Sequence, residues 1–228
     1  MKTIAIDTSL STGSVAAIDG ERIAVRSLST AGEHARLLAA AIEAVAAELG
    51  WHTAAAECVA VVRGPGSFTG LRVGITTAKA LCWATGSRLL GVSSCEVIAE
   101  GSAAAVGRRD APVTVAFDAG RGEVFAVVVV PDEGSASGWR TEAGRLVAAH
   151  DWLVALPPGS IVTGPGLALL TDALASQPGL LVAPPSAWMP AIATVGHIAL
   201  LRAAAGETDD PAALVPDYIR PSYADEKR

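Results

Sequence analysis

The sequence predicts a two-lobed α/β protein made of two duplicated halves, because two patterns occur twice in the same order. A short apolar strand that ends in aspartate occurs as TIAID (residues 3–7) and as TVAFD (114–118). An apolar strand, a Gly-Pro-Gly turn and a helix occur as VAVVRGPGSFTGL (59–71) and as SIVTGPGLALL (160–170). Repeats of this kind indicate that one arrangement of strands and helices has been used twice.

The first strand of each half is expected to begin a hairpin. A turn that contains glycine follows it, and a second apolar run comes next, GSVAAI (13–18) in the first half and GEVFAV (122–127) in the second. Asp7 and Asp118 therefore occupy equivalent positions at the ends of the two first strands.

Two helices are expected in the first half. One begins at the capping-box pattern Thr30–Glu33 and continues to about Leu49, where Gly50 supplies a C-terminal cap. The other is expected to begin at about Ser67 and to end at about Thr85, where Gly86 stops it. Each carries an apolar stripe at helical spacing, formed by Leu38, Ile42, Val45 and Leu49 in the first and by Leu71, Ile75, Ala78 and Cys82 in the second.

Two glycines, Gly70 and Gly74, lie one turn apart on another face of the second helix. Each costs about 1 kcal/mol of helix stability relative to alanine. We therefore expect a second helix or a stretch of backbone to approach the helix closely at this point.

Changes in composition predict the domain boundaries. A polar break near residues 101–112 separates a first lobe (1–105) from a smaller second lobe (106–190). A late helix at about 191–205 is expected to pack back on the first lobe. The last segment, 207–228, carries three prolines and is expected to be an extended tail.

The composition is that of a globular protein with little affinity of its own for nucleic acid. Hydrophobic residues make up 51% of the 228 residues and charged residues 18%, and the net charge is −6. No cluster of lysine and arginine is present, and such clusters supply most of the binding energy for a phosphate backbone. Any role with RNA is therefore expected to depend on a partner.

Cysteine usage and the N-terminus predict a soluble cytoplasmic protein. Cys58, Cys82 and Cys95 are odd in number and widely spaced, which indicates buried, reduced thiols. MKTIAIDTS enters a strand pattern directly, without the apolar region of a signal peptide. No apolar run approaches the roughly 18 residues that a membrane span needs.

The glycine-rich stretch RGPGSFTGLRVG (63–74) has two readings. It has the strand–turn–helix order of a phosphate cradle, but it lacks Gly-Lys-Ser/Thr, and Gly64, Gly66 and Gly70 miss the G-x-G-x-x-G spacing by one position. The other reading is a tight turn from strand to helix with Ser67 as the N-cap. The sequence favours neither reading.

Other candidate site residues are sparse. Asp7 and Asp118 can face a cleft between the lobes and hold a metal–nucleotide, or each can cap the turn that follows it; capping is favoured for Asp118. The four histidines show no metal-ligand spacing, and no G-x-S-x-G motif is present. The tail carries residue types that are common in interfaces, namely Tyr218, Arg220 and Tyr223.

Five segments together resemble the TsaB (YeaZ) family over nearly the whole chain: AIDTS (5–9), GEHAR (32–36), RGPGSFTGLRVG (63–74), AFDAGRGEVFAV (116–127) and PDYIRPSY (216–223). The resemblance implies an actin/Hsp70-like ATPase (ASKHA) fold with duplicated RNase H-like cores. It also implies a role in forming N6-threonylcarbamoyladenosine on ANN-decoding tRNAs.

The resemblance implies a set of partners. The paralogue TsaD transfers the threonylcarbamoyl group, and TsaB binds and activates it without being the catalyst. The ATPase TsaE completes the complex. A chain of this family is expected to meet tRNA only through the complex, to form a homodimer when alone, and to bind no cofactor by itself. ATP and Mg²⁺ are expected only at the boundary between subunits.

A departure from the TsaD pattern supports the absence of catalysis. TsaD-like proteins carry Gly-Val-Asn-His-x-x-x-His after the second helix, and the two histidines bind the catalytic metal. Gly91-Val92 is present here, but Ser94 and Ile98 stand at the histidine positions. No metal site and no catalytic residue are therefore expected.

The resemblance also implies where the partner docks, on the two helices of the first lobe, although apolar residues there serve either the interface or the core. It assigns no role to His34. The interface candidates are Leu37, Leu38, Ala41, Ile42, Gly70, Val73, Gly74 and Thr77, and the family-motif loop comprises Gly64, Pro65, Gly66, Ser67, Phe68, Thr69 and Arg72.

Two other classes of function stay open. One is an independent ATPase or kinase-like enzyme of the actin-like fold, which would need Asp7 and Asp118 to serve a bound Mg–nucleotide. The other is a glycoprotease-like hydrolase, for which no nucleophile–base pair is present in the sequence.

Overall fold

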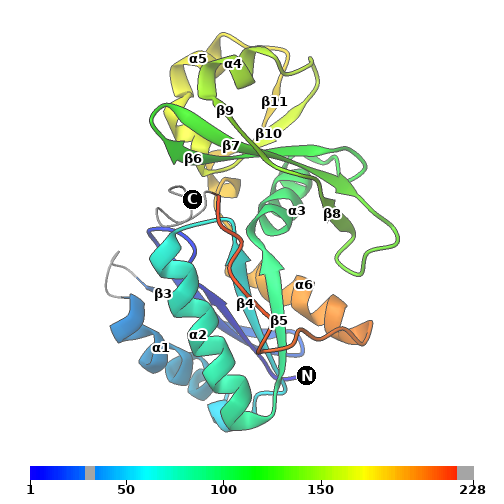
Figure 1. Cartoon of the computed structure of the whole chain (residues 1–228). Coiled ribbons are helices and arrows are strands. Elements are labelled where there is room, and N and C mark those ends of the chain that lie inside the picture. Colours follow the sequence, from blue (N-terminus) through cyan, green and yellow to red (C-terminus); the bar gives the residue numbers. More distant parts are fainter. Residues whose placement is uncertain (29–33, 220–228) are drawn as a thin grey trace. The chain divides into compact units, whose positions relative to one another are not determined.

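The computed structural model describes residues 1–28 and 34–219, and of His34 only the backbone; within these residues the chain forms two compact units (Figure 1). Unit 1 contains Met1–Ser94 and the chain from Ile192 onward, and unit 2 contains Cys95–Ala191. The sequence predicted that the first lobe ends at residue 105 and the second at residue 190. In the structure the divisions between the units come after Ser94 and after Ala191. The first differs because α3 (Ser94–Val106) packs with unit 2, although it directly follows a strand of unit 1.

In the described part of unit 1, five strands form one sheet in the order β3-β2-β1-β4-β5. The first three make an antiparallel meander, and β4 and β5 run parallel to β1. Every residue of β1 is buried, as expected for a central strand covered on both faces. The strands are β1 (Thr3–Asp7), β2 (Gly13–Asp19), β3 (Arg22–Leu28), β4 (Cys58–Gly64) and β5 (Arg88–Ser93).

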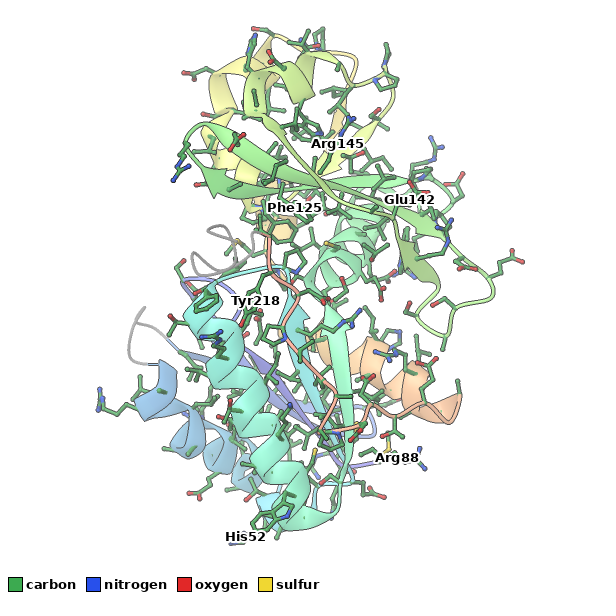
Figure 2. All side chains as sticks on the ribbon, in the orientation of Figure 1. His52, Arg88, Phe125, Glu142, Arg145 and Tyr218 are labelled. Atoms are coloured by element: carbon green, nitrogen blue, oxygen red, sulfur yellow. The ribbon has the colours of Figure 1, made fainter. Side chains whose placement is uncertain are left out.

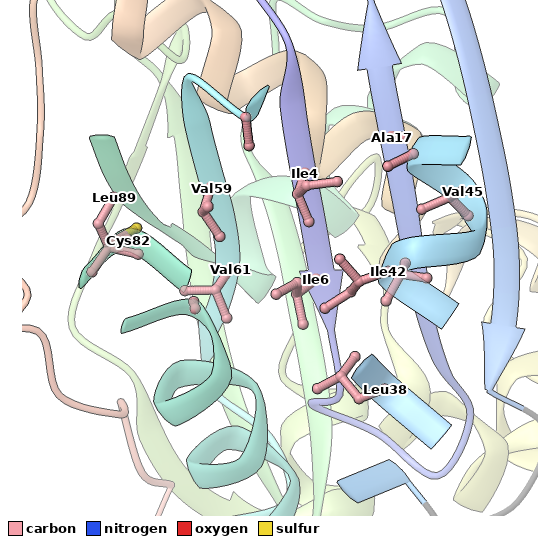
Figure 3. Close-up of a cluster of buried hydrophobic side chains, with 14 of the residues drawn as sticks. Ile4, Ile6, Ala17, Leu38, Ile42, Val45, Val59, Val61, Cys82 and Leu89 are labelled. Atoms are coloured by element: carbon pink, nitrogen blue, oxygen red, sulfur yellow. The ribbon is translucent and has the colours of Figure 1, made fainter. Parts of the chain in front are cut away.

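Helices cover both faces of this sheet. The helices α1 (His34–Glu48) and α2 (Phe68–Thr85) join parallel strands and pack over Ile4 and Ile6, with η1 (Thr53–Ala55) between α1 and β4 (Figure 3). Side chains alternate between the faces of a strand, so Ala5 points the other way. It lies under Gly196 of α6 (Ile192–Ala204), which therefore covers the opposite face.

The helix predictions for the first half are confirmed where the structure describes them. Ser67 is the N-cap of α2, and Gly86 closes the helix with a φ of 72°. The predicted capping box, Thr30–Glu33, lies outside the described residues.

The sheet of unit 2, a stretch that is described throughout, has the order β11-β10-β6-β7-β8, and β9 also pairs with β7. Its helices are short, namely α4 (Ala149–Val154), α5 (Thr171–Ala175) and the 3-10 turns η2 (Pro165–Leu169) and η3 (Pro185–Ala187). The strands are β6 (Val113–Gly120), β7 (Glu123–Pro131), β8 (Trp139–Thr141), β9 (Arg145–Ala148), β10 (Ile161–Thr163) and β11 (Leu181–Val182).

The two sheets repeat one topology, which confirms the predicted duplication. The hairpin β6–β7 corresponds to β1–β2, and β10 and β11 run parallel to β6 as β4 and β5 run parallel to β1. The long helix α2 has a reduced counterpart in η2 and α5. The last helix of each half is exchanged, because α3 follows β5 but belongs to unit 2, whereas α6 follows β11 but belongs to unit 1.

Candidate functional site

The glycine-rich loop is a tight turn between β4 and α2, as the second of the two readings predicts. The Ser67 hydroxyl accepts a hydrogen bond from the Gly70 amide at 3.3 Å. The backbone of Gly64 has a φ of 125°, a conformation that side chains rarely adopt. Binding of an anion at this helix start stays a prediction.

The glycines of the motif make room for the loop between β1 and β2. A side chain at Gly66 would overlap the carbonyl oxygen of Ser9, and one at Gly70 would overlap that of Thr8. A side chain at Gly74 would overlap the Thr8 hydroxyl. Two hydrogen bonds fix this approach, from the Thr8 hydroxyl to the Gly70 carbonyl (2.7 Å) and from the Ser67 amide to the Ser9 carbonyl (2.6 Å).

This packing corrects the idea that Gly70 and Gly74 make room for a helix of another chain. Both glycines are buried, and the groups that approach them belong to the same chain: the Thr8 carbonyl at Gly70, and the side chains of Thr8 and Val61 at Gly74. Of the two possibilities left by the sequence, a second helix or a stretch of backbone, the structure shows backbone at Gly70 and neither of the two at Gly74.

The C-terminal segment, residues 207–219, runs along β5 and reaches the start of the motif (Figure 1). The Asp217 amide donates to the Arg63 carbonyl at 2.7 Å, and the Asp217 carboxylate lies 3.3 Å from the Arg63 guanidinium. Burial raises the pKa of Asp217, and Arg63 partly opposes this. Gly64 has no room for a side chain because the Asp217 carbonyl covers it.

The next residue of this segment, Tyr218, completes a cluster at the start of α2 (Figure 2). The Arg72 Nε donates to the Tyr218 hydroxyl at 2.8 Å. The Arg72 guanidinium lies 3.7 Å from the centre of the Phe68 ring, and the Phe68 and Tyr218 rings are 4.8 Å apart. The two other tail candidates, Arg220 and Tyr223, lie outside the described residues.

The structure separates core from surface among the interface candidates on α1 and α2. Leu38 and Ile42 are buried in the core of unit 1 (Figure 3). Gly70 and Gly74 are also buried, so none of these four residues presents a surface to a partner. The remaining four are half-buried on these two neighbouring helices: Leu37, Ala41, Val73 and Thr77.

Sequence reasoning missed Trp83, which at 90% exposed is the most exposed large apolar residue in the described part of the chain. It belongs to the outer face of α2, which we define as Phe68, Arg72, Thr76, Lys79 and Trp83, spaced so that they share one side of the helix. α2 contains no aspartate or glutamate, so this face is cationic and apolar. The sequence did indicate this exposure, because Trp83 falls outside the apolar stripe of the helix that contains Ala78 and Cys82.

Asp7 and Asp118 each cap the turn that follows, at equivalent places in the two sheets. The Asp7 carboxylate accepts from the Ser9 amide at 2.8 Å, and the Asp118 carboxylate accepts from the Gly120 amide at 2.7 Å. Asp7 is 2% exposed, whereas Asp118 is open to solvent. Both carboxylates therefore cap their turns, and a role of Asp7 and Asp118 in holding a metal–nucleotide stays a prediction.

The two positions that carry histidine in TsaD-like proteins have structural roles here. The Ser94 hydroxyl donates to the Pro65 carbonyl at 2.8 Å, and Ile98 is fully buried. Among the residues that the structure describes, no group of three or more histidine, cysteine or acidic side chains is arranged to hold a metal ion.

Cys58, Cys82 and Cys95 are buried and form no disulfide, as predicted. Burial raises the pKa values of Cys58 and Cys82 to about 11, so both stay protonated at neutral pH. In the described part of the chain, no helix is both long and apolar enough to span a membrane.

Comparison with known proteins connects these features to a family. The model of the family described as TsaD, tRNA N6-adenosine threonylcarbamoyltransferase, matches residues 28–136. The tRNA threonylcarbamoyladenosine biosynthesis protein TsaB of Escherichia coli (strain K12) is 28% identical over 226 residues, which are 98% of this chain and 96% of that protein. The protein of the same name from Bacillus subtilis (strain 168) is 43% identical over 68 residues, 29% of this chain and 28% of that protein.

Among solved structures, YeaZ from Pseudomonas aeruginosa superposes with a TM-score of 0.78 and 23% identity, covering 95% of this chain and 99% of that one. This match and the repeated topology confirm the two-lobed actin/Hsp70-like (ASKHA) fold. The sequence match over 98% of the chain, the match of the TsaD model and the five motifs quoted above support membership of the TsaB (YeaZ) family.

Proposed function

We propose that this chain is a non-catalytic subunit in the formation of N6-threonylcarbamoyladenosine on ANN-decoding tRNAs, and that it binds and activates a TsaD-type transferase. Family membership and the names of the relatives support the pathway. The match of the TsaD model to residues 28–136 supports a partner of related fold.

The observation that carries the binding role is the 90% exposure of Trp83 on α2. A tryptophan buries roughly 150–250 Å² when it is covered, and tryptophan is enriched among the residues that dominate binding energy. We infer that the outer face of α2, with the half-buried side chains on α1, packs against helices of the partner. The same apolar face would pair two copies of this chain when the partner is absent.

Two features support the absence of catalysis. Ser94 and Ile98 supply no imidazole at the positions where TsaD-like proteins bind their metal, and both are engaged in structure. Asp7 already accepts a hydrogen bond within its own turn. We infer that the chain binds no cofactor by itself, that ATP and Mg²⁺ enter only at the subunit boundary, and that tRNA and a TsaE-type ATPase join through the complex.

The test is reconstitution. This chain is combined with the TsaD-like and TsaE-like proteins and the adenylate-forming enzyme of the same organism, with threonine, bicarbonate, ATP and unmodified tRNA. We expect modification of the tRNA to require this chain. Full modification without the chain would refute the activating role.

The Trp83→Ala variant tests the docking face directly. We expect its affinity for the TsaD-like protein to fall about 30-fold, because a central tryptophan commonly contributes 2 kcal/mol or more, about as much as a 30-fold change. Its melting temperature should not change, since the side chain contacts little in the free chain. Val154→Ala, a truncation at another exposed apolar residue (55% exposed) in unit 2, is the matched control.

A further inference from the structure

We propose that Arg72 binds a carboxylate of the TsaD-type partner, and that Tyr218, supplied by the C-terminal segment, is the positioning residue that holds its guanidinium in place. This inference rests on the proposed function, because it assigns a charge contact to the docking face defined above.

The geometry of the cluster restricts how Arg72 can bind. Phe68 covers one face of the guanidinium at 3.7 Å, and the Tyr218 hydroxyl takes the hydrogen bond from Nε. Among residues 1–28 and 34–219, no acidic side chain pairs with the two terminal nitrogens. These two nitrogens form the end of a planar fork that matches the two oxygens of a carboxylate.

Unit 1 fixes the position of Tyr218, because contacts with unit 1 hold the residues that precede it. Leu214 is buried against Gly91, and Asp217 is bound to Arg63 through its amide and its carboxylate. An arginine held in this way loses less side-chain entropy on binding than a free one, which favours a defined contact.

The charge pattern favours a protein carboxylate over an RNA phosphate. α2 carries two cations, Arg72 and Lys79, and no acidic residue, and its other outer-face residues are apolar or neutral. A surface that binds RNA needs several clustered cations, whereas one oriented arginine on the same helix face as an exposed Trp83 is typical of a protein interface. We therefore expect an acidic side chain on the partner helix that packs against α2.

The experiment measures the dissociation constant between the full-length chain and the TsaD-like protein at two salt concentrations, with the melting temperature of each variant. Arg72→Ala should weaken binding about 30-fold and reduce the salt dependence. Arg72→Lys keeps the charge but not the fork, and should weaken binding about tenfold. Lys79→Ala removes the same charge from the same helix, and as the matched control should weaken binding only about twofold.

The Tyr218→Phe variant tests the positioning role, because it keeps the ring and removes only the hydroxyl. We expect about fivefold weaker binding with an unchanged salt dependence and an unchanged melting temperature. Normal affinity in this variant would refute the positioning role. Normal affinity in Arg72→Ala, with Trp83→Ala still defective, would refute the carboxylate contact and leave the proposed function intact.

An RNA contact gives a different result. In that case Arg72→Ala would leave the affinity between the two proteins unchanged and would weaken binding of tRNA to the assembled complex. This outcome would overturn the inference in favour of a phosphate ligand.

Discussion

At the residue scale, the motif RGPGSFTGLRVG is explained by contacts within the chain. Gly66, Gly70 and Gly74 make room for the loop between β1 and β2, while Gly64 makes room for the C-terminal segment. A glycine that lacks space for a side chain is required for packing. We therefore expect its replacement to affect folding before it affects any partner.

Gly70→Ala should lower the free energy of unfolding by about 3 kcal/mol, because its Cβ would overlap the carbonyl oxygen of Thr8 and force the backbone to move. Urea denaturation followed by circular dichroism measures this change. The matched control is Gly101→Ala, at a glycine of α3 with nothing within 4 Å of the added carbon. That variant should gain about 0.5–1 kcal/mol from helix propensity, and equal stability of both variants would contradict this account.

At the scale of elements, the sequence was sufficient to predict α2 but not to predict the contacts of the C-terminal segment. The N-cap Ser67, the C-terminal Gly86 and the buried stripe are local signals, and they predicted α2 to within one residue. The contact between Arg72 and Tyr218 joins residues 146 positions apart, and no local pattern specifies it. For the same reason, the sequence showed a stripe on α1 without separating core Leu38 from half-buried Leu37.

Truncation after Val215 should destabilise the chain by about 2 kcal/mol. It removes the cation–π contact of Arg72 with the Tyr218 ring (5.7 Å to its centre), the pairing of the Phe68 and Tyr218 rings, and the hydrogen bonds of Asp217 and Tyr218, each worth about 1 kcal/mol or less. Hydrogen exchange should also become faster in the glycine-rich loop. Truncation after Ile219, which removes only residues 220–228, is the control and should retain both properties; similar losses in the two truncations would exclude this role of Asp217 and Tyr218.

At the scale of the whole molecule, duplication could be predicted from two short repeated patterns, but the exchange of helices could not. Each half shows its full set of strands in the sequence, so we predicted that the first lobe ends after the helix that follows β5. The structure assigns that helix, α3, to unit 2, because Glu100 and Ser102 bond to Trp139 and Thr163 there. Such pairing depends on tertiary contacts that leave no periodic signal.

A chain truncated after Ala191 should lose the fold of unit 1 and keep that of unit 2. Without α6, the sheet face that carries Ala5 and Ile18 would be open to water. Hydrogen exchange read by mass spectrometry should show unprotected amides in β1 and β4 and protected amides in β6 and β7. Protection of β1 in this truncated chain would show that α6 is not needed.

The exchange of helices has a consequence for synthesis on the ribosome. Unit 2 is one continuous stretch, Cys95–Ala191, and is complete as soon as that stretch has emerged. Unit 1 begins first but is completed last, because it waits for Ile192–Ala204. The two units of the nascent chain are therefore expected to finish folding in the reverse of the order in which they are begun, with the first strands held incomplete until α6 has been made.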